Sequence, residues 1–147
     1  MLKHIPPILS PELLHVLAEM GHGDEIVLGD GNFPAAGIAR RLIRADGHST
    51  PALLDAILTL FPLDTYVECP VALMDNGEPG NPPPIWQEYS RIILAREGDR
   101  QVELVERFAF YERARHAFAV VATGEGALYA NILLKKGVVA PEKDDVS

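Results

Sequence analysis

Short apolar runs rich in β-branched residues alternate along this chain with segments whose apolar residues recur at helical spacing. The short runs predict strands over residues 25–29, 41–45, 67–74, 101–106, 118–122 and 128–135. Helical stripes between them predict helices over residues 11–20, 50–61, 85–93 and 108–115. Strands that alternate with helices favour a parallel sheet covered on both faces. The sequence therefore predicts an α/β fold, a three-layer single domain whose mostly parallel, mixed central sheet is flanked by helices.

Length and charge narrow the range of partners. The chain has 147 residues, and we expect one domain over residues 1–140 with a solvated C-terminal tail at 141–147. Its net charge of -8 and the absence of a Lys- or Arg-rich stripe argue against nucleic acid and anionic membranes as partners. The sequence shows neither a signal-peptide h-region nor an apolar stretch of about 18 residues, so the expected location is cytoplasmic.

Motifs for cofactors and metals are incomplete in this sequence. The Gly-Asp-Gly sequence at 29–31 begins like a dinucleotide fingerprint, but Pro34 stands where the third glycine is needed. Two Glu-x-x-His spacings, ending at His15 and His22, would each supply only two metal ligands. Cys69 is the only cysteine, and we expect a buried structural thiol there and not a nucleophile. No cofactor and no metal are expected.

The most distinctive polar residues are a histidine between two glycines and an acid after the first predicted strand. His22 follows the first predicted helix, and Asp30 lies where α/β sheets commonly bind ligands. Glycines on both sides of His22 free it from packing constraints, which suits proton transfer on a small ligand. The helix C-terminus and a nearby Asp30 carboxylate would both favour the imidazolium. A helix cap is the alternative interpretation of His22. The remaining histidines are expected at the surface, namely His4, His15, His48 and His116.

Three further residues suggest recognition of a polyhydroxylated ring. Tyr129 and Asn131 are two residues apart on a predicted strand, so both side chains should lie on one face. A phenol and a carboxamide side by side can stack on a sugar and bind its hydroxyls. Arg107, expected at the end of a strand, adds a fixed fork of donors. Each residue also has an ordinary interpretation, as a half-buried strand residue, a turn former or a surface charge.

Several colinear segments resemble the D-ribose pyranase / L-fucose mutarotase family. The resemblance spans nearly the whole chain, and the segment at 107–113 favours the L-fucose mutarotase branch. The Gly31-Asn32 pair and the proline-rich segment 75–84 differ from the family pattern and should shape the pocket. The similar segments are residues 10–14, 20–26, 30, 33–35, 43–47, 107–114, 123–125 and 129–137.

The resemblance implies a mutarotase that interconverts the α and β anomers of a monosaccharide, with L-fucose as the expected substrate. It implies that His22 is the proton donor, with Asp30 and Tyr129 also catalytic. The substrate-binding residues implied by the family are Asp30, Arg107, Tyr129, Ala130 and Asn131. The family works without a cofactor and forms ring-shaped homo-oligomers, commonly decamers, with the site near a subunit boundary.

By this hypothesis His22 protonates the ring oxygen and Asp30 positions the imidazole, while Tyr129 either stacks on the sugar or relays a proton. A non-catalytic sugar-binding or transport-accessory protein is the alternative, but it leaves the glycine-flanked His22 unexplained. An isomerase or aldolase acting on an open-chain sugar would want a metal or a Schiff-base lysine. Solvated surface positions are the better interpretation of Lys135 and Lys136.

Overall fold

Six strands form one sheet in the order β2-β5-β1-β6-β3-β4 in the computed structural model, which describes residues 1–141. Strand β5 is parallel to β1 and β2, β3 is parallel to β4, and β6 is antiparallel to both β1 and β3. Five strands therefore run in one direction and β6 alone runs against them, which confirms the predicted mixed, mostly parallel sheet. The strands are β1 (Glu25–Gly29), β2 (Leu42–Ala45), β3 (Val71–Met74), β4 (Val102–Val105), β5 (Ala119–Thr123) and β6 (Ile132–Lys135).

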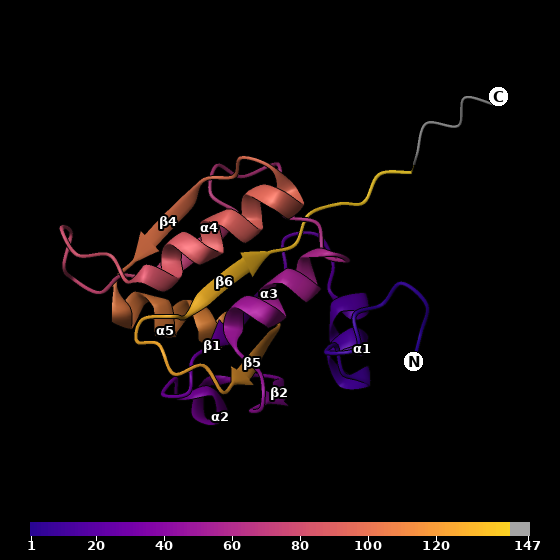
Figure 1. Ribbon diagram of the computed structural model, residues 1–147, viewed down its shortest axis with the longest axis horizontal. Coiled ribbons are helices and arrows are strands. Elements are labelled where there is room, and N and C mark those ends of the chain that lie inside the picture. The colour runs from indigo at the N-terminus through magenta and orange to yellow at the C-terminus, as the bar shows by residue number, and fades with distance from the viewer. Residues whose placement is uncertain (142–147) are drawn as a thin grey trace.

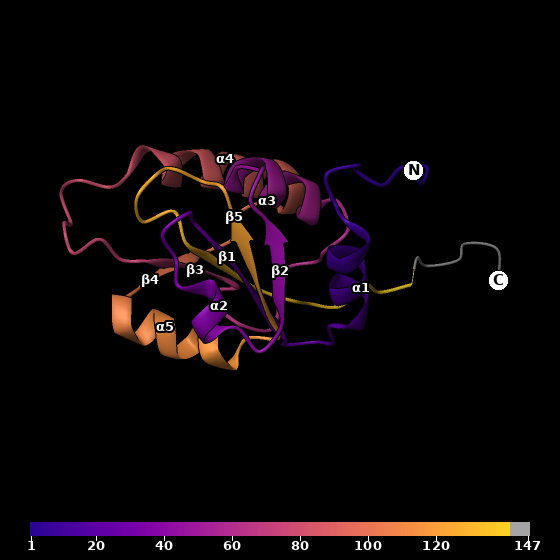
Figure 2. The same cartoon turned by 90° about the horizontal axis from the view of Figure 1, so that it is seen from below.

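Helices cover both faces of this sheet and complete the predicted three layers (Figure 1). Helices α3 and α4 lie over one face, α2 and α5 lie over the other, and α1 lies at one end (Figure 2). The helices are α1 (Pro11–Glu19), α2 (Ala35–Ile38), α3 (Thr50–Leu58), α4 (Pro84–Glu97) and α5 (Arg107–His116).

Alternation along the strands divides the interior into two cores. Ile26 and Leu28 of β1 pack in the core that also holds residues of α1, α3 and α4, whereas Val27 packs in the core with residues of α2 and α5. Leu133 of β6 likewise faces the second core, between two residues that face the first. Successive strand side chains point to opposite faces, so a strand covered on both sides must be apolar throughout. This explains the continuous apolar runs in the sequence.

Two helices begin with the same local signal. Leu13 donates its backbone N–H to Ser10 Oγ at 3.1 Å, and Ala52 donates to Ser49 Oγ at 3.4 Å. Each serine is the N-cap of its helix, and a proline follows in the first turn. Such caps satisfy backbone donors that have no partner within the helix, which is why these two starts were readable from the sequence.

Two strands begin four residues later than predicted. The predicted strand 67–74 starts only after Pro70, because the preceding residues form bends and proline has no N–H for the ladder. The predicted strand 128–135 starts at Ile132, because Tyr129 has a left-handed backbone with φ of +53°. The four-residue helix α2 is not predicted by the sequence patterns.

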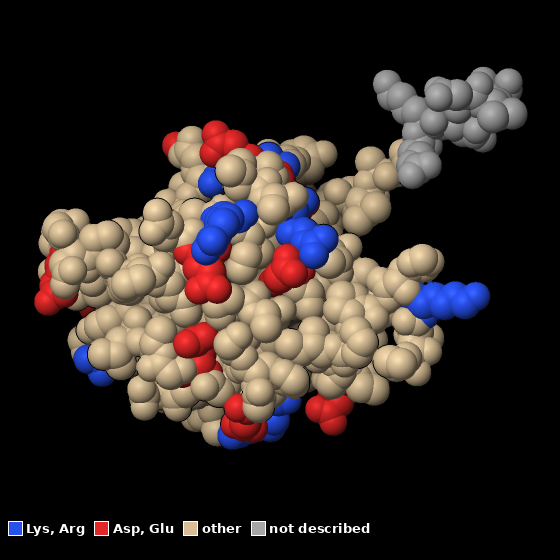
Figure 3. Space-filling view, viewed as in Figure 1, with Lys and Arg blue, Asp and Glu red and all other residues tan. Residues whose placement is uncertain are grey.

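The surface carries acidic and basic side chains side by side, and Figure 3 shows no continuous basic area on the face it draws. No helix within residues 1–141 is long and apolar enough to cross a membrane. Cys69, expected to be buried, is only half-buried. Apart from Pro141, the predicted tail lies outside the described residues.

The close approach of two loops at the ends of β2 and β5 gives a test of the fold. A Cβ added to Gly124 would clash with the backbone oxygen of Asp46, whereas one added to Gly126 would meet no atom of residues 1–141 within 4 Å. We expect Gly124→Ala to lower the free energy of unfolding by about 1–3 kcal/mol in urea titrations, because backbone must move. Gly126→Ala is the matched control and should change it by about 0.5 kcal/mol or less. Equal effects of the two substitutions would contradict this packing.

Candidate active site

The loops that carry most of the predicted site residues meet at one edge of the sheet. Asp30 follows β1, Arg107 follows β4, and residues 129–131 precede β6. Because β6 runs against the other strands, its start lies at the edge where the parallel strands end. The structure therefore brings Asp30, Arg107, Tyr129, Ala130 and Asn131 to the carboxyl edge, where sheets of this kind bind ligands.

Asp30 is a buried carboxylate held by backbone groups, with 6% of its surface exposed. The N–H of Asn32 donates to Oδ1 at 2.9 Å, and the N–H of Ala130 donates to Oδ2 at 3.4 Å. Asp30 donates its own N–H to Asn131 Oδ1 at 2.8 Å. Burial raises the pKa of Asp30 and repulsion from Glu125 adds to it, while the backbone donors act against both. A carboxyl group with a raised pKa at a ligand edge is suited to exchange protons.

Tyr129 and Asn131 are not paired by strand alternation as predicted. Tyr129 lies in a turn with a left-handed backbone, and its half-buried side chain packs against the core next to α5. Asn131 is buried, with its carboxamide turned toward the N–H of Asp30 and the Sδ of Met74. Asn131 therefore supports the Asp30 loop, while the side chain of Tyr129 stays partly exposed at the carboxyl edge.

Arg107 is the first residue of α5 and not the last of a strand, since Glu106 caps that helix. Its exposed guanidinium donates from Nε to the hydroxyl of Tyr111 at 3.2 Å. Arg107 and Tyr129 lie on a hollow of about 190 Å³. Tyr111 also packs its ring against Phe33, with 5.6 Å between centroids. Sequence reasoning missed Tyr111, although its spacing of four residues from Arg107 on a predicted helix was the available signal.

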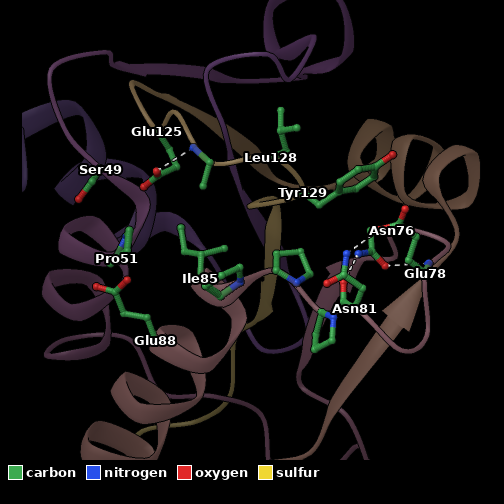
Figure 4. A pocket seen from close by; sticks show the side chains of 14 residues that line it. Ser49, Pro51, Asn76, Glu78, Asn81, Ile85, Glu88, Glu125, Leu128 and Tyr129 are labelled. Atoms are coloured by element: carbon green, nitrogen blue, oxygen red, sulfur yellow. Dashed lines mark hydrogen bonds between the residues drawn. The ribbon is translucent and has the colours of Figure 1, made fainter.

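A larger cavity of about 800 Å³ lies on the other side of Tyr129 (Figure 4). Glu125 and Tyr129 lie on opposite sides of this cavity, with Ile85 between them. Asn76, from the proline-rich loop, borders both this cavity and the hollow beside Arg107. The loop 75–84 thus forms one wall of the candidate site.

His22 lies at the opposite edge of the sheet. It precedes β1 whereas Asp30 follows it, and a strand of five residues separates them by roughly 15 Å. The imidazole Nε2 lies 3.0 Å from Oδ1 of Asp64, and its ring centroid lies 5.1 Å from that of Tyr66. The expectation that Asp30 stands beside His22 within one chain is therefore wrong, because residues before and after a strand lie at different edges.

Asp64 is the partner of His22 that the sequence did not reveal. Its side chain is 3% exposed, against 46% for His22, so a buried carboxylate supports a half-exposed imidazole. Burial opposes the charge, yet the N–H of Tyr66 and the bond to His22 hold the pKa of Asp64 below its usual value. The two residues are 42 positions apart, and no spacing pattern links them.

The helix-cap interpretation of His22 is not favoured by the geometry. The ammonium of Lys136 donates to the carbonyls of Leu17 and Met20 at the end of α1. A cation at this position satisfies terminal carbonyls and the helix dipole. Lys136 is half-buried, so it has a structural role in place of the solvated position that was expected.

Comparison with known proteins adds three relatives of high similarity. Residues 3–139 match the model of the RbsD / FucU transport protein family. The fucose mutarotase of Mus musculus is 56% identical over 145 residues, covering 94% of this chain and 95% of that protein. The L-fucose mutarotase of Actinobacillus pleuropneumoniae serotype 5b (strain L20) is 54% identical over 141 residues, covering 94% and 97%. The crystal structure of the fucose mutarotase in complex with L-fucose from Streptococcus pneumoniae has a TM-score of 0.91 and 51% identity, covering 95% of this chain and all of that one.

The His22–Asp64 pair makes a prediction about stability and pH. Because the pKa of Asp64 is lowered in the folded protein, its contribution is present above the ordinary carboxyl pKa of about 4 and is lost as pH falls through the folded value. We expect Asp64→Asn to lower the free energy of unfolding by about 1–3 kcal/mol at pH 5. The difference from the unsubstituted protein should shrink between pH 5 and pH 2.5.

Asp46→Asn is the matched control, since Asp46 also forms an ion pair, with Arg44, but its side chain is exposed. Exposed ion pairs contribute little, so this substitution should have little effect at either pH. Urea titrations at the two pH values measure both variants. A destabilisation by Asp64→Asn that is the same at pH 5 and pH 2.5 would contradict the assignment.

Proposed function

The chain belongs to the RbsD / FucU family, and on that premise we propose that it is a mutarotase that interconverts the α and β anomers of L-fucose. The observation that carries this proposal is the hollow shared by Arg107 and Tyr129 at the carboxyl edge, where Asp30 binds the residue after Tyr129, in a fold shared with an L-fucose complex at 51% identity. The sequence resemblance assigns these same residues to the sugar.

Anomer exchange needs little from a protein. The ring oxygen receives a proton and the anomeric hydroxyl loses one, so the ring opens to a carbonyl. The C1–C2 bond then rotates, and the reverse transfers close the ring on the other face. No electron or group leaves the sugar, so acid–base side chains and a grip on the hydroxyls are sufficient. This chemistry requires no cofactor.

The carboxyl edge supplies groups that bind the sugar hydroxyls and a general base. The exposed guanidinium of Arg107 offers a fork of donors to sugar hydroxyls, and the phenol of Tyr129 lies across the same hollow. Asp30, with its raised pKa, takes the proton of the anomeric hydroxyl. The N–H of Ala130 and the carboxamide of Asn131 hold Asp30 in place.

The acid comes from a second copy of the chain. His22 and Asp30 lie at opposite edges of one sheet, so they meet at one sugar only if the amino edge of one subunit faces the carboxyl edge of the next. Such a head-to-tail contact repeats from subunit to subunit, and it gives a ring where the rotation between neighbours closes. Tyr66, 76% exposed beside His22, and the exposed Leu128 and Phe108 near the other edge would be covered by it. A decamer remains the predicted size.

Within this arrangement Asp64 takes the role first expected of Asp30. Its buried carboxylate orients the imidazole of His22 and stabilises the imidazolium that donates to the ring oxygen. A non-catalytic sugar-binding protein would use the groups at the carboxyl edge equally well but has no use for this pair. The cytoplasm remains the predicted location.

Replacement of His22 tests the acid role. We expect His22→Ala to slow L-fucose anomer exchange by about 10²–10⁴-fold, the usual contribution of a general acid. Binding of L-fucose should persist, because the residues that hold the sugar lie at the other edge. Saturation-transfer NMR measures the exchange, and His116→Ala, at an exposed helix position, is the matched control. Unchanged exchange in His22→Ala would remove this residue from the mechanism.

A further inference from the structure

The backbone of Tyr129 is in a conformation that tyrosine rarely adopts. Its φ of +53° falls in the left-handed region, which costs energy for any residue with a Cβ. Such a residue persists only where the surrounding structure holds it. The groups that hold Tyr129 are therefore relevant to how its side chain meets a ligand.

Two aromatic donors of α4 hold the carbonyls of Tyr129 and its neighbour. Trp86 donates from Nε1 to the carbonyl of Tyr129 at 2.8 Å, and Tyr89 donates from its hydroxyl to the carbonyl of Ala130 at 2.6 Å. Residues three apart lie on one face of a helix, so both donors reach the same turn. Burial raises the pKa of Tyr89, which keeps its hydroxyl protonated as a donor. The start of α4 lies near the start of β6 in Figure 1, as these two hydrogen bonds require.

The same turn is bonded to Asp30 on its other side. The N–H of Ala130 donates to Oδ2 of Asp30, and the carboxamide of Asn131 accepts the N–H of Asp30. Ala130 therefore links two parts of the structure. Its carbonyl is bound by α4, and its N–H binds the carboxylate of Asp30. A displacement at α4 would move both Tyr129 and Asp30.

The proline-rich loop fixes where these donors stand. Pro83 is the N-cap of α4 and Pro84 is its first residue, and both have backbones restricted by their rings. Trp86 follows two residues later and donates its own N–H to the carbonyl of Pro83 at 3.1 Å. The loop 75–84, which differs from the family pattern, thus sets the position of the Trp86 indole.

We propose that Trp86 and Tyr89 are positioning residues of the mutarotase, which hold the Tyr129–Asn131 turn in the geometry that the sugar requires. Neither residue lines the cavity or the hollow beside Tyr129, and Trp86 acts on the site through Tyr129, whose carbonyl it binds. This inference rests on the proposed function.

Trp86→Phe is the direct test, because phenylalanine keeps a six-membered aromatic ring but lacks the five-membered ring of the indole, which carries the N–H donor. Anomer exchange of L-fucose gives kcat and KM, and thermal unfolding reports whether the fold is kept. Ser90→Ala is the matched control, since Ser90 is on the same helix and its exposed hydroxyl donates to the carbonyl of Trp86. Tyr89→Phe is a second variant, which removes the donor to Ala130.

A double-mutant cycle with Tyr129→Ala separates positioning from a general structural role. We expect Trp86→Phe to lower kcat/KM by about fivefold or more in the unsubstituted protein but by less than about twofold once Tyr129 is alanine. The parameter that Trp86→Phe changes, kcat or KM, should be the one that Tyr129→Ala changes. Ser90→Ala should leave both unchanged.

Two results would overturn the inference. One is no effect of Trp86→Phe on kcat or KM in a protein that exchanges anomers. The other is an equal effect in both backgrounds, which would mean that Trp86 acts independently of Tyr129. Absence of exchange in the unsubstituted protein would instead reject the proposed function, so the two failures are distinguishable.

Discussion

Strand direction determines which chemical groups of this protein can meet. Five strands end at one edge of the sheet, and β6 begins there, so six loops converge at that edge. The opposite edge carries His22 and Asp64. Within a single chain, His22 and the buried carboxylate of Asp64 therefore lie apart from the groups that would bind a sugar. The proposed mechanism therefore needs a second copy of the chain.

The hydrogen bonds at the carboxyl edge offset the unfavourable free energy of burying the Asp30 carboxylate. A buried carboxylate is unfavourable unless hydrogen bonds replace the water that it loses. Two backbone N–H groups, from Asn32 and Ala130, donate to its oxygens, and Asn131 binds its backbone. The donors of α4 hold the same turn from behind. The Asp30 carboxyl group, with its raised pKa, and the left-handed turn at Tyr129 thus depend on one hydrogen-bond network.

The sequence predicted those features that local chemistry determines. Strand β1 has the predicted bounds because an apolar run ends at Gly29, and Ser10 caps α1 as its position before Pro11 suggests. The left-handed backbone of Tyr129 could not be read, because contacts with a helix more than 40 residues away impose it. The His22–Asp64 pair was also inaccessible, since it joins distant loops whose meeting depends on sheet order.

Co-assembly of two inactive variants can show whether one site takes residues from two subunits. Chains carrying His22→Ala and chains carrying Asp30→Asn are co-expressed in equal amounts, and L-fucose exchange is measured by saturation-transfer NMR. If each site takes His22 from one subunit and Asp30 from the next, about one quarter of the sites in random mixtures keep both residues. We expect recovery of about a quarter of the unsubstituted rate from two variants that are each inactive alone. Mixed assemblies that stay inactive would contradict it.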